Sequence, residues 1–214
     1  PIIGTLVLLG ITDKTLFLAA RSEHYFVMTV CFCFGEQGLA GAMVVQLALW
    51  FWAGVSKLTP HFPAVLAVMT SNPPLVRSPK IRHLMYRDAP HDLRPSKLAH
   101  ILAYMGSGVE LLFPILLLIG DGATLTFMGL TLGILFHIYI TSNFPMAVPI
   151  EWNVNMVYGA FFFFAGPTAF HLSDISSPLL WGYLFLTCFL IPLVGNLEPR
   201  LVSFLLSMRY YAGN

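Results

Sequence analysis

Charged residues are scarce in this sequence. Asp, Glu, Lys and Arg make up 10% of its 214 residues, whereas a water-soluble domain carries roughly a quarter. Hydrophobic residues make up 57% and the mean hydropathy is +0.77. Runs such as residues 161–164, four consecutive phenylalanines, could not all be hidden in one small soluble core. The shortage of charge therefore excludes an ordinary soluble enzyme, and the apolar runs indicate an integral membrane protein.

Cysteine and clustered metal ligands are also scarce. The three cysteines are Cys31, Cys33 and Cys188, and their spacing predicts neither a disulfide framework nor a zinc site, so we interpret them as buried thiols. The seven histidines are scattered without ligand spacing, and the sequence has neither a P-loop nor a GxGxxG motif. We therefore predict no metal centre, with His91-Asp92 as the best residual candidate. The net charge of +1 gives no support for nucleic-acid binding.

Five stretches are long and apolar enough to cross a bilayer as helices, which takes about 20 residues. They are residues 39–58, 98–119, 123–141, 150–170 and 179–195. Two weaker stretches precede them, residues 1–11 and residues 16–34, and Arg21 and Glu23 interrupt the second. We therefore predict an all-α fold, a polytopic transmembrane helix bundle with about six or seven spans. Because the chain begins inside an apolar run and ends without a polar tail, we expect residues 1–214 to be one transmembrane domain of a longer protein.

The basic residues predict which side of the membrane each connector occupies. When the connectors are assigned alternately to two sides, all the Lys and Arg residues fall on one side, and the other side receives residues 35–38, 121–122 and 171–178. Lys and Arg in short connectors favour the cytoplasm. We therefore predict a multi-pass protein of the cell inner (cytoplasmic) membrane, with its long loop in the cytoplasm.

That loop, residues 59–97, is rich in proline and basic residues. Seven prolines prevent one continuous helix, although residues 63–70 and 80–87 could form short helices on the membrane surface. A solvated loop that holds anionic lipid headgroups is the simpler interpretation. The headgroup-binding residues that we predict are Arg77, Lys80, Arg82 and Arg87.

Ionisable residues inside the apolar stretches need a reason, because each costs a few kcal/mol to insert. Glu110 lies near the middle of its stretch; it either forms a structural hydrogen bond to a facing helix or belongs to a substrate or proton pathway. Lys57 ends its stretch, where it either reaches the lipid headgroups or, if enclosed by apolar groups, acts as a base. His137 is either an interhelical hydrogen-bonding group or a catalytic partner.

A further group of polar residues surrounds two prolines, Pro145 and Pro149. Pro149 suits the first turn of the next helix, and Glu151 near that helix N-terminus is favourable for a carboxylate. Asn155 lies one turn further on the same face, and Trp152 is either an interface anchor or part of a pathway. We propose Lys57, His137 and Glu151 as catalytic candidates, and a single polar pocket near the cytoplasmic leaflet is geometrically allowed. Glu110, Asn155 and Trp152 are the corresponding candidates for a substrate or proton pathway.

Several short motifs distributed over nearly the whole chain resemble an uncharacterised family of bacterial multi-pass membrane proteins. The motifs are Asp13-Lys14 with residues 17–21, Ser56-Lys57-Leu58 with His61-Phe62-Pro63, Ser71-Asn72-Pro73, Asp92-Leu93-Arg94-Pro95, residues 145–153 and residues 209–214. Members of that family are longer at both ends. This resemblance implies an architecture and no activity.

Two segments also resemble, more remotely, the horizontally transferred transmembrane (HTTM) domain of vitamin-K-dependent gamma-carboxylase. They are the aromatic-rich stretch that ends Ala53-Gly54-Val55-Ser56-Lys57-Leu58, and Phe136-His137 in a segment that ends in a proline turn. In the carboxylase a lysine of that stretch is taken as the base that deprotonates the reduced quinone, and Lys57 is the matching position. The sequence lacks that enzyme's large extramembrane substrate-binding domain, so the resemblance does not imply peptide carboxylation.

Three functions follow from these observations. The first is an enzyme on a lipophilic substrate, a quinol or a lipid, with Lys57 as base and a quinone or lipid as bound molecule. The second is a non-catalytic subunit that packs with other membrane protein subunits. The third is a lipid or small-molecule carrier with Glu110 as its coupling site. The lipid bilayer is the partner that all three share.

Overall fold

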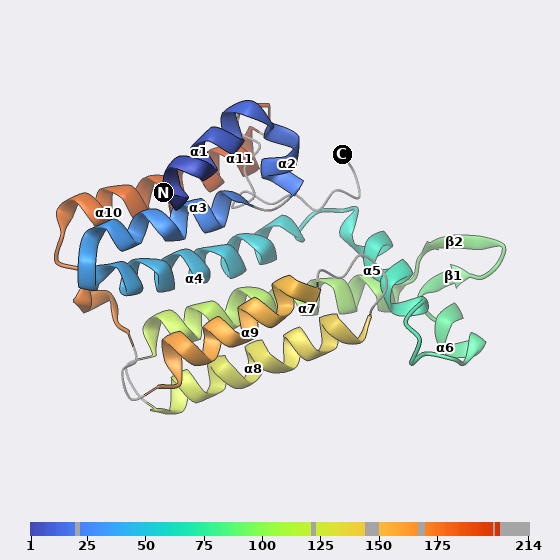
Figure 1. The fold of residues 1–214 in the computed structure, drawn as a ribbon. Coiled ribbons are helices and arrows are strands. Elements are labelled where there is room, and N and C mark those ends of the chain that lie inside the picture. The colour runs from blue at the N-terminus through green and yellow to red at the C-terminus, as the bar shows by residue number, and fades with distance from the viewer. Residues whose placement is uncertain (20–21, 121–122, 144–149, 167–169, 199, 202–214) are drawn as a thin grey trace. The chain divides into compact units, whose positions relative to one another are not determined.

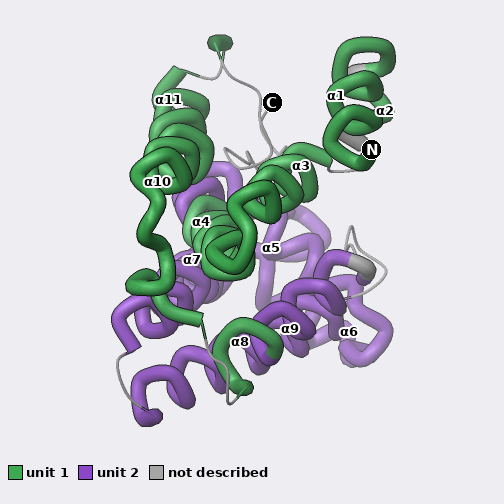
Figure 2. The backbone as a smooth tube through the Cα atoms, turned by 60° about the vertical axis from the view of Figure 1, so that its left-hand side comes forward, with its two compact units in different colours: residues 1–53, 162–209 green, residues 54–161, 210–214 purple. Residues whose placement is uncertain are grey.

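The structure is a computed structural model of residues 1–214 and is mostly helical (Figure 1). It describes the chain except for residues 20–21, 121–122, 144–149, 167–169, 199 and 202–214, and except for the side chains at positions 14, 18, 19 and 151. Contacts divide the chain into two compact units, residues 1–53 with 162–209 and residues 54–161 with 210–214 (Figure 2). We call these unit 1 and unit 2. The division falls within α4 (Gly38–Ser56) and α9 (Ile150–Phe164).

Unit 1 contains most of α4, the last residues of α9, and the helices at the two ends of the chain. Its other elements are α1 (Ile2–Thr12), α2 (Lys14–Ala19), α3 (Ser22–Cys31), a 3₁₀ segment (Phe32–Gln37), a 3₁₀ turn (Leu172–Asp174), α10 (Pro178–Leu184), a π-helical segment (Phe185–Leu190) and α11 (Ile191–Leu197). The last three follow one another without interruption and form a helix of 20 residues.

A tight turn separates α3 from α4. Phe34 and Gly35 leave helical geometry there, and Gly35 has a φ of 64°, a left-handed backbone that glycine tolerates best. After the turn α4 runs back beside α3 (Figure 1), and a Cβ atom placed on Gly41 would lie only 3.1 Å from the Cys31 sulfur. The segment of 35 residues from Ser22 to Ser56 therefore forms two antiparallel helices.

A side chain of α4 compensates for a proline in the C-terminal helix of unit 1. Pro192 has no N–H to donate to the Cys188 carbonyl four residues earlier, and the helix widens into its π segment just before the proline. The indole N–H of Trp52 donates to that Cys188 carbonyl over 2.8 Å. A backbone acceptor inside an apolar segment is thereby satisfied, as the low-dielectric surroundings require.

Unit 2 contains the loop and three longer helices. Its elements are the end of α4, α5 (Phe62–Ser71), α6 (Pro79–His83), β1 (Tyr86–Asp88), β2 (Asp92–Pro95), α7 (Lys97–Ile119), α8 (Ala123–Ser142) and most of α9. α7 and α8 approach closely through small residues: a Cβ atom on Gly129 would lie 2.9 Å from the Leu117 side chain, and one on Gly133 would lie 3.1 Å from Phe113. Glycines four residues apart are a common device for bringing membrane helices together.

The loop is more ordered than its prolines suggest, and it corrects the all-α prediction. α5 confirms the short helix predicted at residues 63–70, but the helix predicted at residues 80–87 ends at His83. Residues 86–88 form a strand instead, antiparallel to Asp92–Pro95. Pro90 lies in the turn between the two strands, where it cannot continue a helix, and residues 86–88 find their backbone partners in β2 instead of in a helix. The chain therefore turns back and pairs with itself.

Four segments among the described residues are long and apolar enough to cross a membrane. α4, α7, α8 and the helix Pro178–Leu197 agree closely with four of the five strong predictions. The fifth, residues 150–170, is longer than α9, which has 15 residues and is about 22 Å long. The weak stretch 16–34 is divided between α2 and α3. Six or seven spans are therefore not confirmed.

Candidate functional site

Lys57 and Glu110 form a buried ion pair in unit 2. The Lys57 ammonium donates to the Glu110 carboxylate, and the two residues are only 9% and 4% exposed. α4 ends in a tight turn, in which the Lys57 N–H donates to the Gly54 carbonyl over 3.2 Å. Gly54 lets α7 come close, because a Cβ atom there would lie 2.9 Å from the Leu111 side chain. The missing side chain of Gly54 thus allows Lys57, one turn later, to reach Glu110 rather than the membrane surface.

Aromatic rings surround this pair. The Lys57 Nζ lies 5.5 Å from the centre of the Phe136 ring, within the range of a cation–π contact. Phe113, one turn after Glu110, is fully buried, with its ring centre 6.2 Å from that of Phe136. Pro114 follows in the middle of α7 and cannot donate to the Glu110 carbonyl. The charges are therefore enclosed by apolar groups, where an unpaired charge would be costly.

His137 lies beside the same aromatic rings and forms a hydrogen bond with Asn153. Its ring centre lies 6.4 Å from that of Phe113, and its Nδ1 lies 2.7 Å from the Asn153 side-chain oxygen. Because an amide oxygen only accepts, Nδ1 carries the proton, and in the neutral ring Nε2 is an acceptor. We call Lys57, Glu110, Phe113, Phe136, His137 and Asn153 the polar cluster.

A pocket of about 560 Å³ lies beside the polar cluster, within unit 2. α5 and the loop after it form one part of its wall, and α7 and α8 form the other. Its lining residues are Thr70, Pro73, Leu75, Val76, Ile81, Met85, Leu102, Met105, Gly106, Val109, Leu132, Leu135, Phe136, Tyr139, Ser142 and Asn143. Most of these side chains are apolar, and the volume suits a small lipophilic molecule or one chain of a lipid. One of these lining residues, Phe136, also contacts Lys57.

The chain matches, over residues 1–214, the model of a family described as transmembrane proteins of unknown function (DUF3556). It belongs to this family. No curated protein and no solved structure matches it. The match confirms an uncharacterised transmembrane family and a membrane location, and it agrees with the apolar helices of the structure.

In this member of the DUF3556 family, the structure brings together two residues for which the sequence predicted separate roles. Lys57, a catalytic candidate, directly contacts Glu110, a pathway candidate. His137 joins them through the ring of its neighbour Phe136. The side chain of Glu151 lies outside the described residues.

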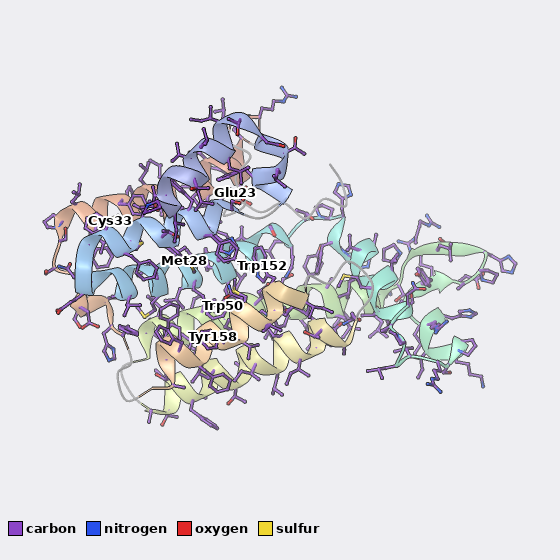
Figure 3. The ribbon with its side chains drawn as sticks, in the orientation of Figure 1. Glu23, Met28, Cys33, Trp50, Trp152 and Tyr158 are labelled. Carbon is purple, nitrogen blue, oxygen red and sulfur yellow. The ribbon has the colours of Figure 1, made fainter. Side chains whose placement is uncertain are left out.

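The two remaining candidates lie on α9. Trp152 lies in the first turn of this helix (Figure 3), and both Trp152 and Asn155 are half-buried. The residue of α9 that contacts His137 is Asn153.

Sequence reasoning missed two members of the cluster and a second buried site. Asn153 lies between the chosen candidates Trp152 and Asn155, and Phe136 has no chemical group that would single it out. In unit 1, Glu23 (Figure 3) and the adjacent His24 on α3 are almost fully buried, and the sequence marked Glu23 only as an interruption of an apolar stretch. Burial depends on neighbours distant in sequence, so no local signal could have found these positions.

The predicted headgroup residues lie on the loop of unit 2. Arg77, Lys80 and Arg87 are exposed, and Arg82 is half-buried because its Nε donates to the Val76 carbonyl over 2.7 Å.

The β-hairpin of the same loop contains an ion pair. Arg94 donates to both carboxylate oxygens of Asp92, over 2.9 and 2.7 Å. These hydrogen bonds lower the pKa of Asp92 to about 2 and raise the pKa of Arg94. The pair lies within β2 and neutralises one of the loop's basic side chains.

Proposed function

We propose that unit 2 binds a lipophilic molecule, a quinol or a lipid, in the pocket, and that Lys57 acts as a base on this molecule. The observation that carries this proposal is the position of Phe136, which lines the pocket on one side and contacts Lys57 on the other. A small movement of this one ring would connect an apolar binding site to a buried ion pair.

The Lys57–Glu110 pair has the chemistry that such a base needs. In apolar surroundings a proton can pass from the ammonium to the carboxylate, which leaves a neutral amine beside a neutral acid. The amine then takes the proton of a bound hydroxyl group, and a lipid or quinol anion forms beside the new ammonium. His137 Nε2, held as an acceptor by the Asn153 hydrogen bond, would receive a proton in a later step.

The remote resemblance to the HTTM domain supports the same assignment. The matching stretch ends Ala53-Gly54-Val55-Ser56-Lys57-Leu58, and in the carboxylase its lysine is taken as the base that deprotonates a reduced quinone. In this chain the stretch contains Gly54, whose lack of a side chain lets Lys57 approach Glu110.

Two glycines of α7 provide a matched test of the binding step. Gly106 lines the pocket, and a Cβ atom there would meet Phe136 at 4.0 Å, so Gly106→Leu fills the pocket. Gly108 has nothing within 4 Å of its Cβ position, so Gly108→Leu is the control. We expect Gly106→Leu to reduce labelling by an isoprenoid quinone that carries a diazirine in its tail, and Gly108→Leu to leave it unchanged. Equal labelling of both variants would refute binding in this pocket.

The chemical step is tested by comparing variants of Lys57. The purified full chain and its Lys57→Ala and Lys57→Arg variants are incubated with extracted membrane lipids and quinols, and the products are measured by mass spectrometry. We expect products with the wild type alone, because arginine does not release its proton in proteins. Conversion by Lys57→Ala equal to that of the wild type, with the fold intact by circular dichroism, would exclude Lys57 as the base.

The pair also supports the carrier alternative. A buried ion pair next to an open pocket could exchange its partner for a transported cation or proton, with Glu110 as the coupling site. A proteoliposome flux assay separates the two functions: transport that continues with Lys57→Ala but stops with Glu110→Gln would favour the carrier.

A subunit role has one supporting observation, the broad exposed apolar face of α8, which includes Phe127, Leu135 and Ile138. Stoichiometric co-purification with another membrane protein would favour it. We further propose the inner membrane as the location, several passes, and a cytoplasmic loop, as the distribution of basic residues predicts.

A further inference from the structure

We infer that the molecule bound in the pocket is an anionic lipid, one whose phosphate group is held by the basic loop while its apolar chain fills the pocket. This inference rests on the proposed function and specifies its substrate class. Charge, pocket geometry and burial in unit 2 each support it.

The positive charge of the chain is concentrated in the loop that forms part of the pocket wall. Residues 59–97 contain six basic and two acidic side chains, whereas the rest of the chain contains five basic and eight acidic ones. The loop therefore carries a net charge of +4 and the remainder a net charge of −3. A basic segment beside a membrane attracts anionic lipids, by about a factor of five for each Lys or Arg near the surface.

Basic and pocket-lining residues alternate along the loop. Leu75 and Val76 line the pocket and Arg77 follows them, while Ile81 lines it between Lys80 and Arg82. The Arg82 Nε donates to the carbonyl of the lining residue Val76, which fixes the guanidinium group beside the pocket wall. Arg77 and Lys80 are exposed next to it. A phosphate suits this arrangement, because guanidinium groups bind phosphate oxygens in pairs and lysine adds a point charge.

Two apolar pocket-lining residues next to these basic side chains are exposed. Leu75 is 77% exposed and Ile81 is 52% exposed, although both face the pocket. Apolar side chains interspersed with basic ones are typical of segments that lie at the boundary between headgroups and acyl chains. A neutral lipid would cover the apolar residues alone, and free phosphate would cover the basic ones alone. An anionic lipid covers both.

The chain offers a matched control for the charge. Lys80 precedes the pocket-lining residue Ile81, whereas Lys97 is also exposed, belongs to the same loop and is not next to a described residue that lines the pocket. Lys80→Gln and Lys97→Gln therefore remove the same charge, the first beside the pocket wall and the second away from its described lining residues.

The experiment uses the full chain in nanodiscs and two photoactivatable lipids. Phosphatidylglycerol and phosphatidylcholine, each with a diazirine on its acyl chain, are added at the same mole fraction, and labelled peptides are mapped by mass spectrometry. We expect phosphatidylglycerol to label the peptides that contain Met105, Leu135 and Tyr139 about tenfold more strongly than phosphatidylcholine. We expect Lys80→Gln to reduce that preference about fivefold and Lys97→Gln to retain it. Free glycerol phosphate should not compete, because it has no chain for the pocket.

Each opposite result has a distinct meaning. If the two lipids label the wild type equally and Gly106→Leu abolishes this labelling, the preference for an anionic headgroup is overturned. The proposed binding function would still stand. An equal loss in both charge variants would overturn the phosphate site and assign the preference to the charge of the whole loop. Labelling that Gly106→Leu does not change would overturn both the inference and the proposed function.

Discussion

At the scale of single residues, the polar cluster shows how a membrane protein can retain buried charge. Lys57 or Glu110 alone would cost about 3 kcal/mol to insert at the centre of a helix. In contact, each supplies the charge that the other needs, and the ring of Phe136 lies 5.5 Å from the Lys57 Nζ. Each charge is therefore tolerated only while the other is in contact with it. The same contact allows a proton to move between the two side chains.

The first prediction concerns this mutual dependence. Lys57→Met and Glu110→Gln should each lower the free energy of unfolding by about 3 kcal/mol, because each leaves one buried polar group without its partner. The double variant Lys57→Met/Glu110→Gln should lose clearly less than the sum of the two. Reversible unfolding in mixed detergent measures all three, with Lys97→Met, an exposed lysine of the loop, as the control. Strictly additive losses would show that the two side chains do not interact.

At the scale of secondary-structure elements, prolines decide where regular geometry ends. Pro90 turns the loop into a hairpin. Pro192 leaves the Cys188 carbonyl to an indole on another helix. Pro114 lies within the continuous helix α7, one turn after Glu110, and cannot donate to the Glu110 carbonyl. In each case the lost backbone hydrogen bond leaves an acceptor for another group or ends the element.

The second prediction follows from the contact between Trp52 and Cys188. Trp52→Phe should destabilise the protein by about 1 kcal/mol, because a buried carbonyl loses a donor. In a Pro192→Ala background the same substitution should cost less, since the backbone N–H that replaces the proline nitrogen can donate to the Cys188 carbonyl. Thermal unfolding of the four variants in nanodiscs gives the coupling. An identical cost of Trp52→Phe in both backgrounds would argue against compensation for the proline.

The third prediction concerns the Asp92–Arg94 ion pair of the hairpin. The pKa of Asp92 is about 2 in the folded protein and about 3.9 in an unfolded chain. A lowered folded pKa means that the pair stabilises the hairpin fully above about pH 4 and loses this effect as the pH falls toward 2. Arg94→Gln should return the titration midpoint of the Asp92 carboxyl group to near its ordinary value, whereas Arg77→Gln should not change this midpoint. Carbon-13 NMR of the Asp92 carboxyl measures both, and a wild-type midpoint near 4 would show that the pair does not form.

At the scale of the whole molecule, membership of a transmembrane family and the four apolar segments agree on a membrane protein. The basic loop and the polar cluster both belong to unit 2. This arrangement connects the orientation of the protein with its proposed function, because the loop forms part of the pocket wall.

The fourth prediction tests that orientation. In a variant without native cysteines, His91→Cys in the exposed turn of the hairpin should be protected from a membrane-impermeant maleimide in intact cells, and Glu36→Cys should react. Both should react after the cells are opened. Labelling of His91→Cys from outside would reverse the predicted topology and place the basic loop on the opposite face.

The sequence by itself determined the properties that depend on neighbours along the chain. Hydropathy over about 20 residues located α4, α7, α8 and the C-terminal helix to within a few residues, because a helix in lipid must be apolar along its own length. The same reasoning selected Lys57, Glu110 and His137, since charged or polar groups are rare in such segments.

Only the tertiary structure decided which of these residues meet. Lys57 and Glu110 are 53 positions apart, and the sequence predicts different depths in the membrane for them. They meet because Gly54 lets the end of α4 pack closely against α7. The rotation of α9 about its axis decides that Asn153, and not Asn155, is the hydrogen-bond partner of His137. Hydropathy does not encode this rotation. Contacts between helices depend on how distant surfaces fit together, and in a sequence that is apolar almost everywhere the local pattern does not specify that fit.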